Sequence, residues 1–514
     1  MKKKNLEARF EVFSVGIIVF ITFLSLIRFN YLPQFIDGYY HLSVANGFMK
    51  SGGWVGWDWW DFSPWGRPHL YPPLYHFILV FLKKVGVSGI NSLRLTESLI
   101  TPLFFFVLWR TSRKLVSSQF SFFVLLTLSS FFSFYSSVSA NVPSSIAIIF
   151  GLLVWRFLLK KKVFFAVFFL TLAFYTHPGI PWIFTLSILF LALLNKPYRK
   201  LSLLLVFFSL IFASPLIFHQ IKYITYVNLS ILHEVKFIHF SIFILILSLF
   251  SIFILNKKGK LSEPVYLLFL GYTVASLVVF FKYPYRFFSS QGILGLGLLS
   301  SLLWMGKKVR VKSLVVAYLF FLHSTFDLNQ GKLEINLFNS TYYNFLSGRV
   351  FTLLEFTSLF YPDYYQPVIK VIEKYTKENE IISSNLSITS QIFSSLTNRP
   401  SSNSILGEVN PLRKKRKLEL LPSYSLSSPS NFIFNEFVKL VVWIKPMKKE
   451  IEEKINKGRL IKVYENDVAC VLINPYCHFR MQPIPSPINF SVILVLFVFF
   501  ILLLFLKPNF PLKK

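Results

Sequence analysis

The sequence predicts a polytopic α-helical membrane protein with about twelve transmembrane helices and a small external α/β domain before the last span. Of its 514 residues, 54% are hydrophobic, 15% are charged and 61 are phenylalanine. The apolar residues gather in runs of roughly 17 to 25, the length that crosses a bilayer as a helix. Clusters of Lys and Arg recur between alternate runs, which is typical of cytoplasmic loops.

Residues 1–326 form the predicted transmembrane domain. Its N-terminus, Met1 to Arg9, is basic, and the apolar run that follows has no small-residue cleavage site, so we expect an uncleaved first span. The predicted spans are 10–28, 93–109, 118–135, 143–159, 163–177, 180–194, 201–218, 238–255, 264–281, 287–305, 313–326 and 488–506.

The charge of the loops predicts the orientation. With the N-terminus inside, every loop expected on the cytoplasmic side is basic, whereas the intervening loops 136–142 and 176–181 contain no Lys or Arg. The basic loops are 110–114, 156–162, 195–200, 256–260, 306–312 and the tail from 507. We therefore expect a multi-pass plasma-membrane protein with both termini in the cytoplasm, and we attribute the net charge of +31 to topology, not to nucleic-acid binding.

The first external loop is long, about residues 29–92, and contains the apolar segment 70–85. A crossing at this segment would place every later basic loop outside, which the charge pattern rejects. The segment is also short and opens with Tyr71, Pro72 and Pro73. We interpret it as an interfacial or re-entrant helix on the outer face.

Residues 327–487 are polar and form the predicted external soluble α/β domain. Helical periodicity covers 366–378 and 446–457, a strand is expected at 380–384, and 460–464 with 468–473 is expected to form a hairpin. Residues 488–514 supply the last span and a cytoplasmic tail. The two cysteines, Cys470 and Cys477, are compatible with a disulfide or with two thiols.

External carboxylates are scarce in the transmembrane domain, because no Asp or Glu occurs from Ser98 to His233. The external acids are Asp37, Asp58, Asp61, Glu97 and Glu234. A general base or a divalent cation must draw on these five. All nine histidines fall in external segments or at the external ends of spans, which indicates an external polar cavity, or the ordinary preference of His for interfaces.

Five motifs follow the first span in order: DGYYH (37–41), WxWWD (57–61), PxGR (64–67), YPPL (71–74) and LRL (93–95). Together they resemble the first external loop of GT-C membrane glycosyltransferases, which include the catalytic subunit of oligosaccharyltransferases and the protein mannosyltransferases. The resemblance extends over residues 10 to about 310.

The resemblance implies an enzyme whose donor sugar is carried by a polyprenyl phosphate or pyrophosphate. In that superfamily an Asp early in the loop is the catalytic carboxylate, and Asp37 matches it. His41 and His177, the latter in FYTHPG, are expected to support the site. Arg286, with Lys282 in KYPYRFF, is expected to bind the phosphate, because this leaving group gains negative charge as the glycosidic bond breaks.

The remaining candidate substrate-binding residues come mostly from the first loop. They are Asp58, Asp61, Arg67, His69, Tyr71 and, from a later external loop, Glu234. For Arg286 the alternative is an Arg that snorkels at the interface, and for Glu234 it is a solvated loop charge.

No metal ligand is expected. The segment 137–150 resembles the second external loop of oligosaccharyltransferases, where an acidic pair helps to bind the metal. Pro143, Ser144 and Ser145 stand at those places here. The pattern therefore favours a metal-free mechanism, as in the protein mannosyltransferases, over use of Mg²⁺ or Mn²⁺.

The first loop is also rich in tryptophan, and two interpretations stay open. The side chains could form a belt at the membrane interface, or a platform on which sugars or a polyprenyl chain stack. The residues concerned are Trp54, Trp57, Trp59, Trp60 and Trp65.

These features predict transfer of a sugar from a polyprenyl-phosphate donor to a protein, lipid or glycan acceptor on the external face. Two alternatives remain. A lipid-linked sugar flippase usually needs charged residues deep within its spans, and few occur here. An inactive GT-C-like scaffold is favoured by the missing acidic pair.

Overall fold

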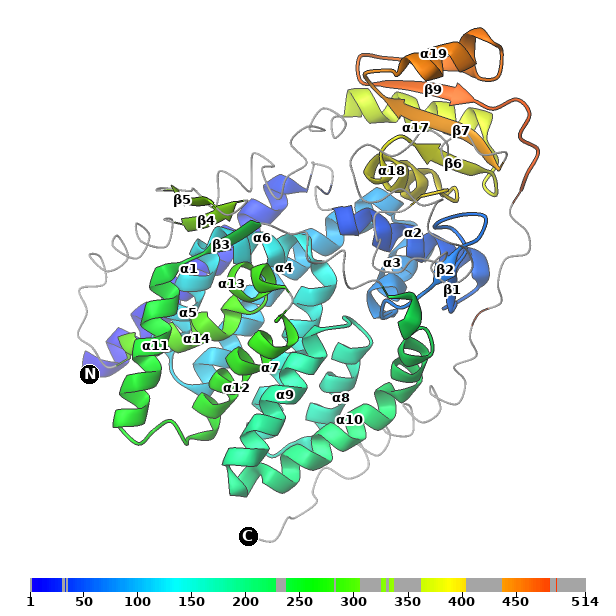
Figure 1. The fold of residues 1–514 in the computed structure, drawn as a ribbon. Helices are drawn as coiled ribbons and strands as arrows, with labels where there is room; N and C mark the ends of the chain where they lie inside the picture. The colour runs from blue at the N-terminus through cyan, green and yellow to red at the C-terminus, as the bar shows by residue number, and fades with distance from the viewer. Residues whose placement is uncertain are drawn as a thin grey trace.

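The computed structural model describes residues 2–29, 33, 36–227, 237–281, 283–305, 325–329, 332–336, 362–403, 437–480 and 487. Most of residues 2–305 is helical, and the helices pack side by side in one bundle (Figure 1). Its helices are α1 (Lys2–Arg28), α2 (Ile36–Ser51), α3 (Leu74–Lys84), α4 (Gly89–Leu115), α5 (Ser118–Ser130), α6 (Phe132–Ala140), α7 (Val142–Leu159), α8 (Val163–Phe174), α9 (Ile180–Leu194), α10 (Lys196–Lys222), α11 (Ile242–Lys257), α12 (Pro264–Val279), α13 (Pro284–Ser289) and α14 (Ile293–Ser301).

Five helical segments among the described residues are long and apolar enough to cross a membrane. They are Glu7–Ile27, Gly89–Leu115, Val142–Leu159, Lys196–Lys222 and Pro284–Trp304. Helices α5 and α6 form a sixth candidate that is bent by 85°, and α8, α9, α11 and α12 are shorter apolar helices. Apart from residues 325 and 326, the predicted spans 313–326 and 488–506 lie outside the described residues, so the total of twelve stays a prediction.

Local sequence explains where several of these helices begin. The Ser117 hydroxyl accepts the amide N–H of Phe120 at the start of α5, and the Asn141 side chain accepts that of Ser144 at the start of α7. Such side chains satisfy amides that have no partner within the helix. A proline follows near the first position of α7, where the missing N–H costs nothing.

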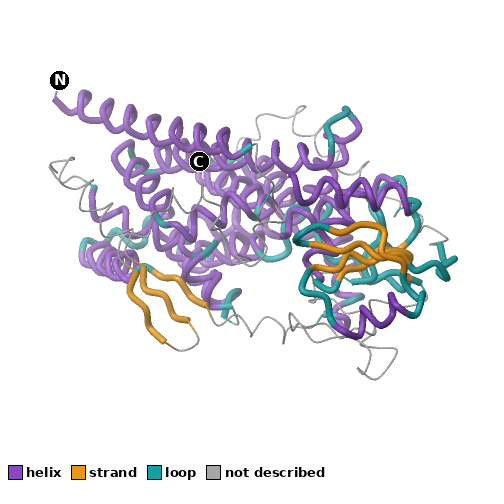
Figure 2. The backbone as a smooth tube through the Cα atoms, turned by 90° about the horizontal axis from the view of Figure 1, so that it is seen from above, coloured by secondary structure: helices purple, strands orange, loops and turns teal. Residues whose placement is uncertain are grey.

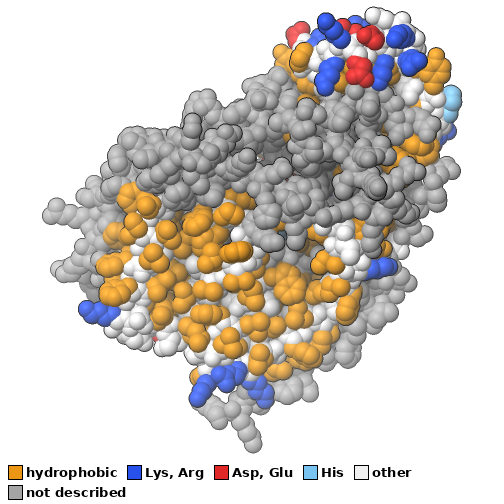
Figure 3. All heavy atoms as spheres, in the orientation of Figure 1, with side chains coloured by type: hydrophobic (Ala, Val, Ile, Leu, Met, Phe, Trp, Pro, Cys, Tyr) orange, Lys and Arg blue, Asp and Glu red, His pale blue; other side chains and the backbone are white. Residues whose placement is uncertain are grey.

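The exterior of the bundle matches a membrane environment. On the face shown in Figure 3, hydrophobic side chains cover most of the described helical surface, whereas acidic side chains gather on the unit at the top. Exposed large side chains such as Phe207, Phe253 and Phe281 contribute to the exterior. A soluble protein rarely exposes apolar surface of this extent.

The predicted first loop, about residues 29–92, is more ordered than the sequence predicts. Residues 36–51 form helix α2, which we did not expect, and the predicted interfacial segment 70–85 contains α3. Two short strands, β1 (Trp57–Asp58) and β2 (Arg67–Pro68), pair antiparallel between them. Helix α3 buries Tyr75, His76 and Leu79, so one side of it packs against protein.

Two other expectations are wrong. Residues 132–140, which include most of the predicted loop 136–142, form helix α6. The start of the predicted span 238–255 is strand β3 (Phe237–Phe240), which pairs with β4 (Thr325–Asn329); β4 pairs with β5 (Lys332–Asn336). Strand β4 therefore crosses the expected domain boundary between residues 326 and 327 and connects its two sides.

The C-terminal α/β unit comprises residues 362–403 and 437–480. Its sheet has the strand order β6-β7-β9-β8, with β6 parallel to β7 and the other pairs antiparallel. The unit lies at one end of the helical bundle (Figures 1 and 2). Its elements are α17 (Pro362–Tyr375), β6 (Ile381–Ser384), α18 (Ser387–Thr397), β7 (Val438–Ile444), α19 (Lys449–Asn456), β8 (Ile461–Glu465) and β9 (Ala469–Ile473).

The predicted helices, strand and hairpin of this region are present with small shifts in their bounds. Strand β7 reads VKLVVWI, and all but one of its residues are buried. This continuous apolar run is explained by cover on both faces of the sheet. Cys470 and Cys477 are both buried free thiols.

The unit is docked on the first loop through α18 and α2 (Figure 1). Asn46 donates to the carbonyl of Ser395 at 2.9 Å, and Gln391 donates to the Ser43 hydroxyl at 2.9 Å. The backbone of Ser401 also bonds to that of Trp60. The loop and the unit therefore share one buried interface.

Candidate functional site

Helix α2 carries two of the predicted site residues, Asp37 and His41. They are four residues apart in the helix, so their side chains are neighbours on one face. Asp37 lies in the first turn, where the positive end of the helix dipole stabilises a carboxylate. Asp37 is half-buried, whereas the His41 side chain is 2% exposed.

His41 is held from three sides by aromatic residues. Its Nδ1 lies 2.9 Å from Nε2 of His76, which is on α3. The ring centroids of Tyr71 and Tyr75 lie 4.8 and 5.1 Å from that of His41, both edge to face. Burial, with a further contribution from His69, lowers the pKa of His41 to about 3, so its imidazole is neutral at physiological pH.

His177 comes to the same place from the turn between α8 and α9. The amide of Leu74 donates to the carbonyl of Tyr175 at 2.8 Å, which ties the first loop to this turn. The ring of Tyr71 then lies 6.1 Å from that of His177. Burial lowers the pKa of His177, and the positive charge of Arg286 lowers it further.

Arg286 lies on the short helix α13. Its Nε donates to the Tyr285 hydroxyl at 2.8 Å, and its guanidinium lies 6.0 Å from the ring of Tyr283. Its positive charge contributes to the lowered pKa of His177. The fold thus brings together three residues that the sequence predicts for the site, His41, Tyr71 and His177, and Asp37 lies one helical turn before His41 on α2.

Four other predicted substrate-binding residues form a buried ionic network. Asp58 lies 2.7 Å from Nδ1 of His69 and 3.4 Å from Nε of Arg67, and Arg67 lies 2.7 Å from Asp61. All four side chains are at most 2% exposed. The pairing of Asp58 with Arg67 across β1 and β2 fixes this arrangement. We interpret the network as the internal support of the loop; substrate contact by these residues stays a prediction.

Three of the five tryptophans of the loop are core residues. For these three, the predictions of an interface belt and of a stacking platform are both wrong. Trp54, Trp59 and Trp60 are between 2% and 4% exposed, so they form neither a lipid-facing belt nor an open platform. Trp65 is 44% exposed and Trp57 is half-buried. Packing against α2 and the C-terminal α/β unit accounts for the buried three.

Hydroxyl and amide groups occupy the segment 137–150, which the sequence predicts to resemble a second external loop. Gln291 donates to the hydroxyls of Ser137 and Ser144, each at 3.4 Å, and Ser145 donates to the Val138 carbonyl. Over the described residues, no group of three or more His, Cys, Asp or Glu is arranged to hold a metal ion. The donor set does not fit Mg²⁺ or Mn²⁺, and we derive no step through a metal.

Two predicted residues, Lys282 and Glu234, lie outside the described residues. Conversely, His76 was not among the predicted site residues although it bonds to His41. A signal for it was present, because His76 and Tyr75 belong to the YPPLYH stretch that begins with the predicted Tyr71.

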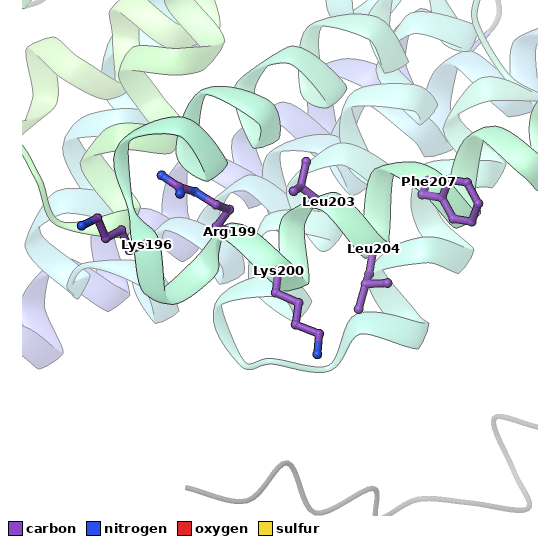
Figure 4. Close-up of a pocket in the computed structure, with 6 residues that line it drawn as sticks. All are labelled: Lys196, Arg199, Lys200, Leu203, Leu204 and Phe207. Atoms are coloured by element: carbon purple, nitrogen blue, oxygen red, sulfur yellow. The ribbon is translucent and has the colours of Figure 1, made fainter.

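A separate groove of about 540 Å³ lies on α10 (Figure 4). Its lining side chains share one face of the helix, basic at the start and apolar beyond it: Lys196, Arg199, Lys200, Leu203, Leu204 and Phe207. Arg199 donates to the carbonyls of Ala192 and Leu193 at the end of α9. This arrangement is typical of basic side chains at a membrane interface, and the groove is not part of the candidate site.

Comparison with solved structures identifies the architecture. ArnT from Cupriavidus metallidurans in the apo state superposes with a TM-score of 0.55 at 14% identity, over 93% of this chain and 99% of that chain. The same protein bound to undecaprenyl phosphate gives a TM-score of 0.54 at 12% identity, over 92% of this chain and 99% of that chain. The chain has a GT-C fold.

A second GT-C structure agrees. AglB, the archaeal oligosaccharyltransferase from Archaeoglobus fulgidus, in complex with an inhibitory peptide and a dolichol-phosphate, gives a TM-score of 0.50 at 11% identity. The alignment covers 84% of this chain and 69% of AglB. No protein-family model and no curated protein matches the sequence. The predicted GT-C resemblance is therefore confirmed at the level of fold.

Proposed function

We propose that this chain is a membrane glycosyltransferase that moves a sugar from a polyprenyl-phosphate donor to a protein, lipid or glycan acceptor on the external face. The observation that supports the proposal is that His41, Tyr71 and His177 lie together within the GT-C fold, with Asp37 on the same helix as His41 and Arg286 on α13. They come from four separate segments of the chain.

Asp37 is the general base that deprotonates an acceptor hydroxyl or orients an acceptor amide. It is the carboxylate whose place in the motif order matches the catalytic Asp of the superfamily. Asp58 and Asp61 are engaged with Arg67 and His69. General-base catalysis contributes about 10²- to 10⁴-fold to a rate.

Arg286 binds the phosphate of the donor and stabilises the charge that develops on it as the glycosidic bond breaks. Binding of undecaprenyl phosphate by ArnT and of dolichol-phosphate by AglB supports this donor class. A lipid-linked donor also suits the apolar exterior of the bundle, because its tail stays in hydrocarbon while its head group reaches the loop.

The test is sugar transfer by the purified full-length chain in proteoliposomes. The donors are undecaprenyl-phosphate and dolichyl-phosphate sugars, the acceptor is a membrane extract from a deletion strain, and mass spectrometry detects the product. We expect Asp37→Asn to lower the transfer rate about 10²- to 10⁴-fold with normal expression.

Asp467→Asn is the matched control, because Asp467 is an exposed carboxylate on the C-terminal α/β unit. Equal transfer by the wild type and Asp37→Asn would remove Asp37 as the base. Lipid-linked sugar counterflow that persists in Asp37→Asn, without any transfer by the wild type, would instead identify a transporter.

A further inference from the structure

The hydrogen bonds of His177 determine which of its nitrogens carries the proton. Its Nδ1 accepts the amide N–H groups of Gly179 at 3.0 Å and Ile180 at 3.2 Å. A ring nitrogen that accepts hydrogen bonds has no proton, so the neutral ring carries its proton on Nε2. These amides belong to the start of α9, whose positive end also opposes protonation of the ring.

The tautomer of His41 follows from its bond to His76. One of the two nitrogens, Nδ1 of His41 or Nε2 of His76, must donate. Nδ1 of His76 is buried and has no hydrogen-bond partner among the described residues. A proton there would leave a buried N–H without an acceptor, which is rarer than an unpaired acceptor. His76 therefore donates through Nε2, and His41 carries its proton on Nε2.

We propose that His41 and His177 are neutral Nε2–H hydrogen-bond donors to the phosphate oxygens of a polyprenyl phosphate, and that His76 is a positioning residue that fixes the tautomer of His41. Tyr71 contacts both rings, and Arg286 adds a positive charge on the His177 side. Neither histidine is then a proton acceptor, which leaves Asp37 as the base. The identity of the ligand rests on the proposed function, whereas the two tautomers do not.

Nuclear magnetic resonance of the full-length chain, labelled with ¹⁵N-histidine in lipid bilayers, measures the tautomers directly. His41→Gln and His177→Gln assign the two signals. We expect both rings to be neutral with the proton on Nε2 at pH 7. A proton on Nδ1 of either ring, or an imidazolium, would overturn the proposal.

Binding of undecaprenyl phosphate tests the roles. His76→Gln keeps an N–H donor at similar reach, so we expect affinity close to that of the wild type. His76→Leu fills the space without a donor, and we expect about 10-fold weaker binding. Equal weakening in both variants would show that His76 acts through packing alone and would overturn its positioning role, as would wild-type affinity in His76→Leu.

His177→Asn separates binding from stability. Asparagine retains an oxygen that accepts the first amides of α9, but its side chain is too short to place an N–H where Nε2 lies. We expect a melting temperature close to that of the wild type and binding that is about 10- to 100-fold weaker. His478→Gln, at an exposed position, is the control. Unchanged binding in His177→Asn would overturn the donor role of His177.

Different results would contradict the proposed function and the present inference. If the wild type binds no polyprenyl phosphate, the proposed function is wrong, whatever the tautomers are. If the wild type binds it but either ring carries its proton on Nδ1, this inference is wrong while the proposed function stands.

Discussion

Asp37 differs from the other acids of the first loop in what surrounds it. Asp58 and Asp61 are buried against Arg67 and His69, and loss of one member would leave a charge unpaired in the interior. Asp37 is half-buried at the start of α2. The loop thus combines two buried carboxylates that support its own fold with one that is partly exposed.

The buried histidines make stability depend on pH. Burial lowers the pKa of His41 to about 3 and that of His76 well below its ordinary value of 6.5. Below pH 6.5 the unfolded chain takes up protons that the folded chain does not, so stability falls as the pH falls from 6.5 towards 3. The slope is at most about 1.4 kcal/mol per pH unit for each histidine.

Thermal unfolding in detergent between pH 7 and pH 5 measures this effect. We expect the melting temperature to fall on acidification, and to fall less in His41→Gln, which has no titrating ring. His478→Gln should leave the slope unchanged, because this residue is exposed. An identical slope in His41→Gln and the wild type would contradict the assignment.

Hydropathy predicts the apolar helices of the bundle better than it predicts helix α2, which carries two of the candidate site residues. The predicted spans 143–159 and 180–194 coincide with α7 and α9, because a continuous apolar run has few alternatives in a membrane. Helix α2 reads IDGYYHLSVANGFMKS and has no apolar stripe. It is buried on nearly all sides by other elements, so tertiary packing stabilises a sequence that locally resembles a loop.

The site itself was predictable only residue by residue. The motif order indicates Asp37, and the chemistry of the leaving group indicates Arg286. The bond between His41 and His76 joins residues 35 positions apart across two helices, and no periodicity reports it. The sequence pattern does not predict the burial of Trp60 either, because this burial depends on α2 being a helix.

Gly47 shows how closely α2 packs against the rest of the loop. A Cβ atom at this position would lie 2.0 Å from Cε3 of Trp60. We expect Gly47→Ala to destabilise the protein by about 1–3 kcal/mol through overpacking, measured as a lower melting temperature. Gly16→Ala is the control, because nothing lies within 4 Å of its Cβ position on α1. Equal melting temperatures for Gly47→Ala and the wild type would show that Trp60 moves freely.

The molecule has two chemically different ends. The C-terminal α/β unit lies at one end, and the basic start of α10 lies at the other, with the apolar helical surface between them (Figures 1 and 3). Helix α10 spans this distance, because His219 near its end bonds to the carbonyl of His69 in the first loop. This geometry is consistent with the predicted orientation, in which the loop faces outward and Lys196 to Lys200 face the cytoplasm.

Cysteine labelling with a membrane-impermeant maleimide tests the orientation. We expect Asp467→Cys to react in intact cells and Lys200→Cys to react only after permeabilisation. Both positions are exposed, and the native Cys470 and Cys477 are buried, so the wild type should give a low background. The reverse pattern would place Asp37 on the cytoplasmic side and exclude the proposed external reaction.

The contact between α2 and α18 also constrains how the protein is made. The hydrogen bond from Asn46 to Ser395 joins positions 349 residues apart. Helix α2 is therefore synthesised long before helix α18, which covers it. The nascent chain must therefore hold its first loop at the membrane in an unfinished form, and Asn46 acquires its partner only when synthesis has passed residue 395.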